Sequence, residues 1–210
     1  MASAPINIAE TCDNASKRKR GPELEQAIRS ACVAELAQCG YGDLTIESVA
    51  ARAQTGKASI YRRWPTKQEL VLDAVTCLMS GPLLTVTRVE LNESVTTRDA
   101  LLDLMIEVVG LMSGPGGDAL RSVMSQSLRD VSFSGTFECE FFDPRKAALV
   151  SLLQRGVDRG EVRRDAIQDF LPDMIAGVLI HRVLIRRQKP TKRELAEMLD
   201  GFIMPAIGPR

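Results

Sequence analysis

The stretch TIESVAARAQTGKASIYRRWPTKQEL, residues 45–70, decides the fold. Thr45 is a residue type that caps helices, and the apolar residues after it recur at the spacing of one helix face. These apolar residues are Ile46, Val49, Ala50 and Ala53. The polar and flexible residues 54–56 interrupt the pattern, and Ile60 is the inward anchor of the segment 57–63 that follows. The stretch therefore predicts two short helices separated by a tight turn.

Further helices flank this pair. Pro65 ends the second helix, because the residue before a proline is pushed away from helical angles. Thr66 and Glu69 have the spacing of a capping box, which starts another helix at residue 67. Ahead of the quoted stretch, an apolar stripe predicts a first helix that ends at Gly40, as a C-cap glycine would end it. The stripe consists of Leu24, Ile28, Ala31, Cys32, Leu36 and Cys39.

The second helix of such a pair fits the DNA major groove, while the helix before it crosses the backbone. Cations neutralise phosphates, hydroxyls donate to phosphate oxygens, and a guanidinium that bonds guanine contributes about 1–3 kcal/mol of discrimination. Small Gly56 and Ala58 would let the backbone approach DNA closely. The predicted DNA contacts here are Thr45, Thr55, Gly56, Lys57, Ala58, Ser59, Tyr61, Arg62, Arg63 and Lys67.

Residues 22–79 resemble the DNA-binding domain of the TetR family of transcriptional regulators. The resemblance is carried by Gly40-Tyr41, Thr45-Ile46, Val49-Ala50, Ala53, the run Lys57-Ala58-Ser59-Ile60-Tyr61, Trp64, Lys67 and Leu70. This chain departs from the family at Gln54, where the family often has glycine. If the backbone there takes a left-handed angle, glutamine costs roughly 1 kcal/mol more than glycine. The resemblance implies a homodimer whose C-terminal half commonly binds small molecules.

Charge is distributed unevenly along a chain of 210 residues whose formal net charge is zero. Residues 17–67 carry ten Lys or Arg against five Asp or Glu, whereas residues 68–210 carry 17 against 20. A local cationic face is sufficient for attraction to DNA, since charges are screened beyond roughly 8 Å at physiological salt. The distribution therefore favours double-stranded DNA as a partner of the N-terminal segment.

Residues 1–21 are predicted to form a disordered basic N-terminal arm. The run Lys17-Arg18-Lys19-Arg20 has two interpretations, a solvated tail or an arm that reaches the minor groove beside the helix-turn-helix. Its adjacency to the predicted reading helix favours the second, with Arg18 and Arg20 as DNA contacts. We expect residues 22–66 to form the DNA-binding domain and residues 67–210 the effector-binding and dimerisation domain.

Helical patterns also fill the C-terminal part of the chain. They predict helices at about 97–113, 116–130, 143–159, 166–187 and 192–206, and no strand pattern competes. Gly114-Pro115-Gly116-Gly117 lacks the Lys-Ser/Thr of a phosphate loop, so it is interpreted as a turn. The predicted fold class is all-α: an N-terminal three-helix helix-turn-helix domain followed by a C-terminal helical ligand-binding and dimerisation domain.

The last two predicted helices are too apolar for a single buried face. The earlier one is apolar on most sides, and the later one begins with a second capping box, Thr191 to Glu194. Two such helices from each subunit would make a four-helix interface, which is also how the family dimerises. The predicted interface residues are Phe170, Met174, Val178, His181, Ile185, Leu195, Met198, Leu199 and Phe202. A two-fold dimer would favour a palindromic operator.

Aromatic and methionine side chains gather in the middle of the chain. Flexible methionines and aromatic faces suit apolar ligands of irregular shape, although ordinary core packing explains the same residues equally well. The family resemblance favours an effector pocket for an unidentified, largely apolar small molecule. Its predicted lining is Met105, Met112, Met124, Phe133, Phe137, Phe141 and Phe142, with the phenylalanines around one connection between helices.

Several function classes find no support in the sequence. The five cysteines form no CxxC pair and have no histidine at metal-ligand spacing, so we expect reduced thiols and no metal. No catalytic or cofactor motif is recognisable from spacing, and we expect neither an enzyme nor a cofactor. The apolar run at residues 174–180 is too short for a membrane span, which favours a cytoplasmic protein without membrane contact.

Three functions remain open. The first is a sequence-specific DNA-binding regulator, a repressor that acts as a homodimer and is released by a small ligand. The second is a helical module whose helix-turn-helix docks a protein, against which the concentration of cations around Tyr61 argues. The third is an enzyme that converts a small molecule in the C-terminal half, for which no reactive constellation is visible.

Overall fold

The computed structural model describes residues 21–81 and 94–209, and all regular elements in these ranges are helical. The all-α class is therefore confirmed. The N-terminal helices are α1 (Pro22–Asp43), α2 (Ile46–Arg52), α3 (Lys57–Tyr61) and α4 (Lys67–Leu78). The later α-helices are α6 (Thr97–Met112), α7 (Pro115–Ser127), α8 (Val131–Phe137), α9 (Asp143–Asp158), α10 (Leu171–Leu179), α11 (Lys192–Met198) and α12 (Met204–Ile207). Three π-helical turns, η1 (Glu138–Phe142), η3 (Ile180–Ile185) and η4 (Leu199–Ile203), and a 3₁₀ turn, η2 (Arg164–Ala166), complete the set.

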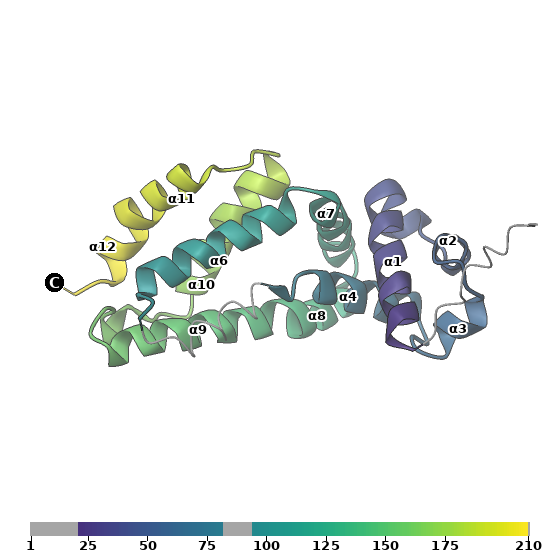
Figure 1. Ribbon diagram of the computed structural model, residues 1–210, viewed down its shortest axis with the longest axis horizontal. Helices are drawn as coiled ribbons and strands as arrows, with labels where there is room; N and C mark the ends of the chain where they lie inside the picture. The colour runs from purple at the N-terminus through teal and green to yellow at the C-terminus, as the bar shows by residue number, and fades with distance from the viewer. Residues whose placement is uncertain (1–20, 82–93, 210) are drawn as a thin grey trace, which may run out of the picture.

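The molecule is elongated, with α1, α2 and α3 at one end and the C-terminus at the other (Figure 1). Helix α4 lies between the two parts and packs against both α1 and α7. Its inward face consists of Leu70, Val71, Leu72, Ala74 and Val75, all buried. Because α4 belongs to the cores of both parts, movement at its C-terminal end can be transmitted to the helices beside it at its N-terminal end. The domain boundary at residues 66 and 67 stays a prediction.

Three predicted boundaries differ from the structure. The segment around the phenylalanines, predicted as a connection, is helical, because α8, η1 and α9 form one continuous rod from residue 131 to 158 (Figure 1). The helix predicted at 166–187 begins at Leu171 instead, with Pro172 in its first turn, where a proline needs no N–H partner. Gly40 interrupts α1 with φ 80°, as predicted, but one further helical turn follows before Leu44.

The predicted turn between α6 and α7 is confirmed at Gly114, but Pro115, Gly116 and Gly117 already belong to the first turn of α7. The junction depends on a close approach. Helices α6 and α7 meet there at an angle of 82°. A Cβ atom added at Gly117 would lie 1.9 Å from the Met112 carbonyl oxygen, far inside van der Waals contact. Glycine at this position therefore lets α7 begin directly against the end of α6.

The turn between α2 and α3 contains a strained glutamine. Gln54 has φ 55°, the left-handed conformation that costs a residue with a side chain roughly 1–2 kcal/mol. The Gln54 N–H donates to the Ala51 carbonyl oxygen at 3.1 Å, and the Thr55 N–H donates to the Ala50 carbonyl oxygen at 3.0 Å. These two bonds close the turn with its geometry intact, so the helix-turn-helix tolerates the missing glycine.

We expect Gln54→Gly to raise the free energy of unfolding by roughly 0.5–1 kcal/mol, because relief of the left-handed strain exceeds the greater chain entropy of glycine when unfolded. Denaturant titration followed by circular dichroism measures this change. The matched control is Gln26→Gly on the exposed face of α1, where glycine should lower stability by about 1 kcal/mol. Equal losses in both variants would show that Gln54 is not strained.

Candidate nucleic-acid interface

Helix α3 is short and is held by a single buried side chain. Five residues are too few for a stable isolated helix, so packing must fix it. Ile60 is fully buried, a burial that contributes roughly 1.5–3 kcal/mol. Gly56, in extended conformation, precedes the helix, and the Ser59 N–H donates to its carbonyl oxygen at 2.9 Å. The rest of the α3 surface is therefore available to a partner.

Five predicted DNA contacts are exposed on or beside α3: Gly56, Lys57, Ala58, Tyr61 and Arg62. Tyr61 keeps 48% of its surface accessible. Arg62 makes no ion pair among the residues that the structure describes. Ser59 and Thr55 are half-buried, and space is open where a Cβ atom at Gly56 would lie. The structure thus places the small residues Gly56 and Ala58 beside the Tyr61 phenol and the Arg62 guanidinium, which has no ion-pair partner among the described residues.

Lys57 has an ion-pair partner on α2. Its Nζ atom lies 2.6 Å from Glu47 Oε1, and this hydrogen bond raises the pKa of Lys57 and lowers the pKa of Glu47. Both side chains are more than half exposed, and exposed pairs of this kind contribute little to stability, with a median of about 0–1 kcal/mol. A phosphate can therefore replace the carboxylate at small cost.

Arg63 occupies a different environment from Arg62. Its Nε donates to Glu25 Oε1 at 3.0 Å, its Nη1 donates to the Ser59 carbonyl oxygen at 2.9 Å, and its side chain is only 18% exposed. Arg63 thus ties the end of α3 to α1. A DNA contact by Arg63 stays a prediction, and its observed contacts are structural.

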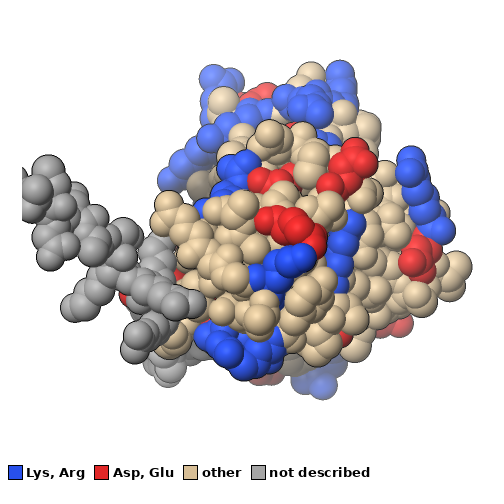
Figure 2. Space-filling model, turned by 90° about the vertical axis from the view of Figure 1, so that its right-hand side faces the viewer, with Lys and Arg blue, Asp and Glu red and all other residues tan. Residues whose placement is uncertain are grey.

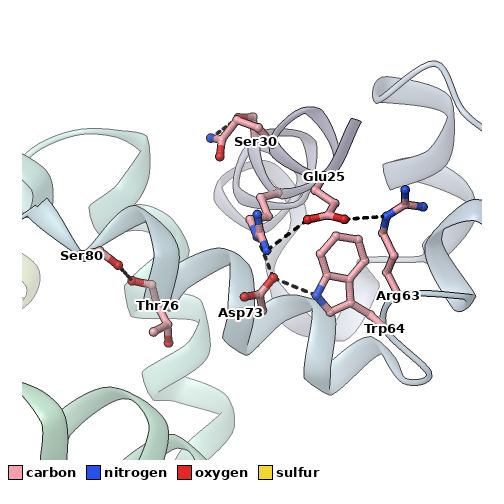
Figure 3. Close-up of polar contacts among 9 residues, drawn as sticks. Glu25, Ser30, Arg63, Trp64, Asp73, Thr76 and Ser80 are labelled. Carbon is pink, nitrogen blue, oxygen red and sulfur yellow. Dashed lines mark hydrogen bonds and ion pairs between the residues drawn. The ribbon is translucent and has the colours of Figure 1, made fainter. Parts of the chain in front are cut away.

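A second polar cluster fixes the chain after α3, and the sequence did not reveal it. The Asp73 carboxylate on α4 accepts from Arg29 Nε at 2.7 Å and from the buried Trp64 indole Nε1 at 2.8 Å (Figure 3). The Arg29 guanidinium also lies over the Trp64 ring, 5.5 Å from its centroid. The Asp73 hydrogen bond raises the pKa of Arg29, so the cation is stabilised. This cluster joins α1, α4 and the segment after α3.

Lys67, the first residue of α4, lies beside the end of α1. Its Nζ donates to the Gly42 carbonyl oxygen at 3.2 Å and sits 4.6 Å from the centroid of the Tyr41 ring. Half-burial lowers the pKa of Lys67. A phosphate contact by Lys67 stays a prediction, and the ammonium must share its donors between DNA and Gly42.

Tyr41 also connects the two parts of the molecule. Its backbone N–H donates to Ser122 Oγ on α7 at 2.6 Å, and its ring meets the Phe133 ring edge-on with centroids 5.0 Å apart. Thus a single residue contacts Lys67 beside the reading helix and the first phenylalanine of the predicted effector region.

The basic excess of the N-terminal segment depends on residues outside the structure. Arg18 and Arg20 lie outside the described residues, and residues 21–67 alone hold six basic and five acidic residues. Lysines and arginines are accordingly spread over the α2–α3 end of the molecule with acidic side chains between them (Figure 2).

Thr45 caps α2, because its side-chain oxygen accepts from the Ser48 N–H at 3.1 Å. A DNA contact by Thr45 stays a prediction.

The predicted dimerisation residues divide into two groups. Met198 is half-buried, while Leu195 and Leu199 are buried inside the protomer. The exposed group is Phe170, Met174, Val178, His181, Ile185 and Phe202. Val178, Met198 and Phe202 line a groove of about 300 Å³ between α10 and α11. Large apolar side chains at 42–76% exposure are typical of interaction surfaces, and a dimer interface here stays a prediction.

The predicted effector residues are packed together. Phe133, Phe137, Phe141, Met105 and Met112 are buried in the core, and Met124 and Phe142 are half-buried against it. Phe137 and Phe141 stack with centroids 4.9 Å apart, and Phe142 lies 5.1 Å from both. Core packing accounts for these contacts, so their role in a pocket stays a prediction.

Other chemistry finds little support in the described part of the chain. It contains no group of three or more metal-ligating side chains, and its four cysteines are free thiols. Burial raises the pKa of the Cys32 thiol to about 12, which makes it unreactive. No single helix in this part is both long and apolar enough to cross a membrane; α6 and α7 meet that criterion only when joined across their bend.

We expect Asp73→Asn to lower the free energy of unfolding by about 1–3 kcal/mol, because the amide loses the charged hydrogen bond from Arg29. Thermal or denaturant unfolding measures this loss. Glu47→Gln is the matched control, since it breaks an ion pair between exposed side chains and should change stability by less than about 0.5 kcal/mol. If the two variants are equally stable, the Asp73 cluster does not hold the domain together.

Comparison with known proteins agrees with this architecture. Residues 28–74 match the family model described as bacterial regulatory proteins, tetR family, and residues 92–201 match the tetracyclin repressor-like C-terminal domain. An HTH-type transcriptional regulator of Mycobacterium tuberculosis is 36% identical over 173 residues, which cover 82% of each chain.

Two solved structures show the same fold. A TetR-family regulator from Mesorhizobium loti superposes with a TM-score of 0.71 at 16% identity, covering 91% of this chain and 100% of that one. The regulator FadR from Bacillus subtilis, solved with stearoyl-CoA, gives a TM-score of 0.66 at 18% identity, covering 86% and 96%. The chain therefore belongs to the TetR family of DNA-binding transcriptional regulators.

Proposed function

We propose that this protein is a repressor that binds a palindromic operator in double-stranded DNA as a homodimer, and that a small molecule releases it. The observation that carries the proposal is the surface of α3, which buries Ile60 and leaves Lys57, Tyr61 and Arg62 accessible. A helix with this surface fits the major groove, where a guanidinium reads guanine and a phenol or ammonium bonds phosphate. The protein would act in the cytoplasm.

Dimerisation would follow from the exposed apolar surface of α10, η3 and η4. Phe170, Met174, Ile185 and Phe202 are more than half exposed. In a two-fold dimer this surface meets its own copy, and the two α3 helices enter successive major grooves roughly 34–36 Å apart. The basic segment with Arg18 and Arg20 would then reach the neighbouring minor groove on each side.

Release would operate through α4. A ligand that prefers one arrangement of the C-terminal helices shifts the equilibrium between two states in proportion to its differential affinity. Support comes from α4 packing on both α1 and α7, and from Tyr41, which contacts both Lys67 and Phe133. The match to a repressor-like C-terminal domain and the stearoyl-CoA bound to FadR favour repression and a ligand with a large apolar part.

Selection of bound fragments from genomic DNA is the decisive experiment. We expect one enriched motif with two-fold symmetry, whose half-sites are about one helical turn apart or a multiple of it. Recovery of no enriched sequence from the full-length dimer at low salt would contradict the proposal.

A Tyr61→Phe, Lys67→Ala double variant should bind all DNA sequences more weakly and with a flatter salt dependence, because both side chains are proposed phosphate contacts. Arg62→Ala should instead relax the preference at one base pair, at a cost of about 1–3 kcal/mol. Titrations of operator and scrambled DNA at several salt concentrations separate the two effects. Lys189→Ala, an exposed lysine far from α3, is the control, and unchanged affinity in the folded double variant would refute the assignment.

An Ile185→Glu, Phe202→Glu double variant should be monomeric, because two carboxylates placed in an apolar interface cannot be buried without a partner. Sedimentation velocity measures the association state. Affinity for the operator should fall at least about tenfold, because a monomer contacts only one half-site. Leu128→Glu changes an 88% exposed leucine outside this surface and should leave the dimer intact. A dimeric double variant would place the interface elsewhere.

A further inference from the structure

Arg145 in the C-terminal domain is a cation that has no counter-ion among the described residues. It lies in the first turn of α9, beside the cluster of Phe137, Phe141 and Phe142. Its guanidinium stacks over the Phe141 ring, 3.9 Å from the centroid. In the described ranges no carboxylate lies within ion-pair distance of Arg145, whereas arginines such as Arg29, Arg63 and Arg98 each have one.

The hydrogen bonds of Arg145 satisfy it only in part. Its Nη1 donates to the Phe141 carbonyl oxygen and its Nη2 to the Thr76 carbonyl oxygen at 3.2 Å. Its Nε is buried and has no partner among the described residues. Burial lowers the pKa of Arg145 to about 10, so the group is still a full cation at neutral pH. Two backbone carbonyls supply partial charges, but they do not neutralise it.

A second unsatisfied polar atom belongs to the residue that Arg145 contacts. Thr76 Oγ1 on α4 is buried and has no hydrogen-bond partner among the described residues. The Thr76 carbonyl oxygen already accepts from both Arg145 and Ser80 Oγ. The Thr76 side chain points away from the Asp73 cluster (Figure 3). Unpaired buried polar groups are rare because each costs free energy, and an acceptor that reaches both the Arg145 Nε and the Thr76 hydroxyl would satisfy two of them.

We propose that Arg145 and Thr76 form the anchor for an anionic ligand whose head group is a carboxylate and whose body is apolar. A carboxylate has four lone-pair sites, so it can accept from Arg145 Nε and from the Thr76 hydroxyl together and neutralise the guanidinium. The apolar body would lie against the half-buried Phe142 ring, because Phe137 and Phe141 are already buried in the core. This assignment rests on the proposed regulation by a small molecule, and it names the chemical class of that molecule.

The anchor also explains how occupancy would reach DNA. The bond from Arg145 to the Thr76 carbonyl oxygen joins α9 to the C-terminal half of α4. An anion that draws the guanidinium toward itself weakens this bond. Because α4 begins at Lys67 beside the reading helix, the change at Thr76 is transmitted along a single rigid element.

Matched pairs of carboxylic acids and their primary amides test the anchor on the full-length protein. The probes are 2-naphthoate with 2-naphthamide and decanoate with decanamide, titrated by calorimetry at pH 7.5. Each amide has nearly the shape of its acid but no charge. We expect each carboxylate to bind about 10- to 100-fold more tightly than its amide, as hydrogen bonds to charged groups do.

Three variants localise that difference. In Arg145→Gln the carboxylates should bind about 10- to 100-fold more weakly while the amides are unaffected, and in Thr76→Val the carboxylates should lose about 3- to 10-fold. Lys146→Gln is the matched control, because it removes one positive charge from the adjacent residue, which pairs with Asp173 at the surface. It should leave both ligand classes unchanged. Thr76→Val is nearly isosteric and keeps the test valid if Arg145→Gln does not fold.

The outcomes separate this inference from the proposed function. If neither carboxylate binds the wild type better than its amide, or if both folded variants retain that preference, the anchor is refuted while operator binding is untouched. If the carboxylates bind through Arg145 but do not change affinity for the selected operator, the anchor stands and ligand-controlled release fails.

Discussion

The orientation of the reading helix depends on one carboxylate that two donors share. Asp73 accepts from Arg29 on α1 and from Trp64 after α3, so three segments meet at a single pair of oxygens. Helix α3 buries only Ile60 and cannot fix its own direction. The ion pair between Arg63 and Glu25 adds a second tie to α1. Since Asp73 sits on α4, any rotation of α4 moves the acceptor to which the end of α3 is bound.

Local chemistry made the helix-turn-helix predictable. Thr45 and Thr66 cap the helices as their spacing predicts, and the Thr191–Glu194 capping box is complete. The resemblance to the TetR family, which often has glycine at position 54, pointed to a left-handed angle there, and Gln54 has one. Each of these features involves residues within a few positions of one another, and such interactions leave a readable pattern in sequence.

The polar clusters were not predictable because their members are far apart in the chain. Arg29 and Asp73 are 44 positions apart, and Arg63 and Glu25 are 38 apart. Sequence reasoning treated Arg63 as equivalent to Arg62, and only the tertiary structure distinguishes them. The sequence likewise does not distinguish Arg145 from the other arginines of the chain. An apolar surrounding and an absent counter-ion are properties of the fold, and no spacing rule encodes them.

The helix that carries the phenylalanines of the predicted effector region could have been recognised from their spacing. Phe133, Phe137 and Phe141 recur every four residues, which is helical spacing, yet the segment was interpreted as a connection between helices. Packing of these rings outweighs the weak helix propensity of the residues between them. On the last helices, Leu195 and Leu199 proved to face the protomer core while Phe202 faces outward. A helix that is apolar on several sides does not reveal which side meets a partner.

The π-helical turns η1, η3 and η4 interrupt the rod beside the phenylalanines and the two helices that carry the exposed apolar surface. Such wide turns accommodate one residue more than an α-helical turn, and each residue of an α-helix corresponds to about 100° of rotation. Loss of one residue from η1 would restore regular winding and leave the side chains of α8 and α9 on the faces they now occupy, because the wide turn holds the extra residue within a single turn. The wide turn at η1 is thus a place where the chain length can change by one residue while the packing faces of the helices on either side are kept.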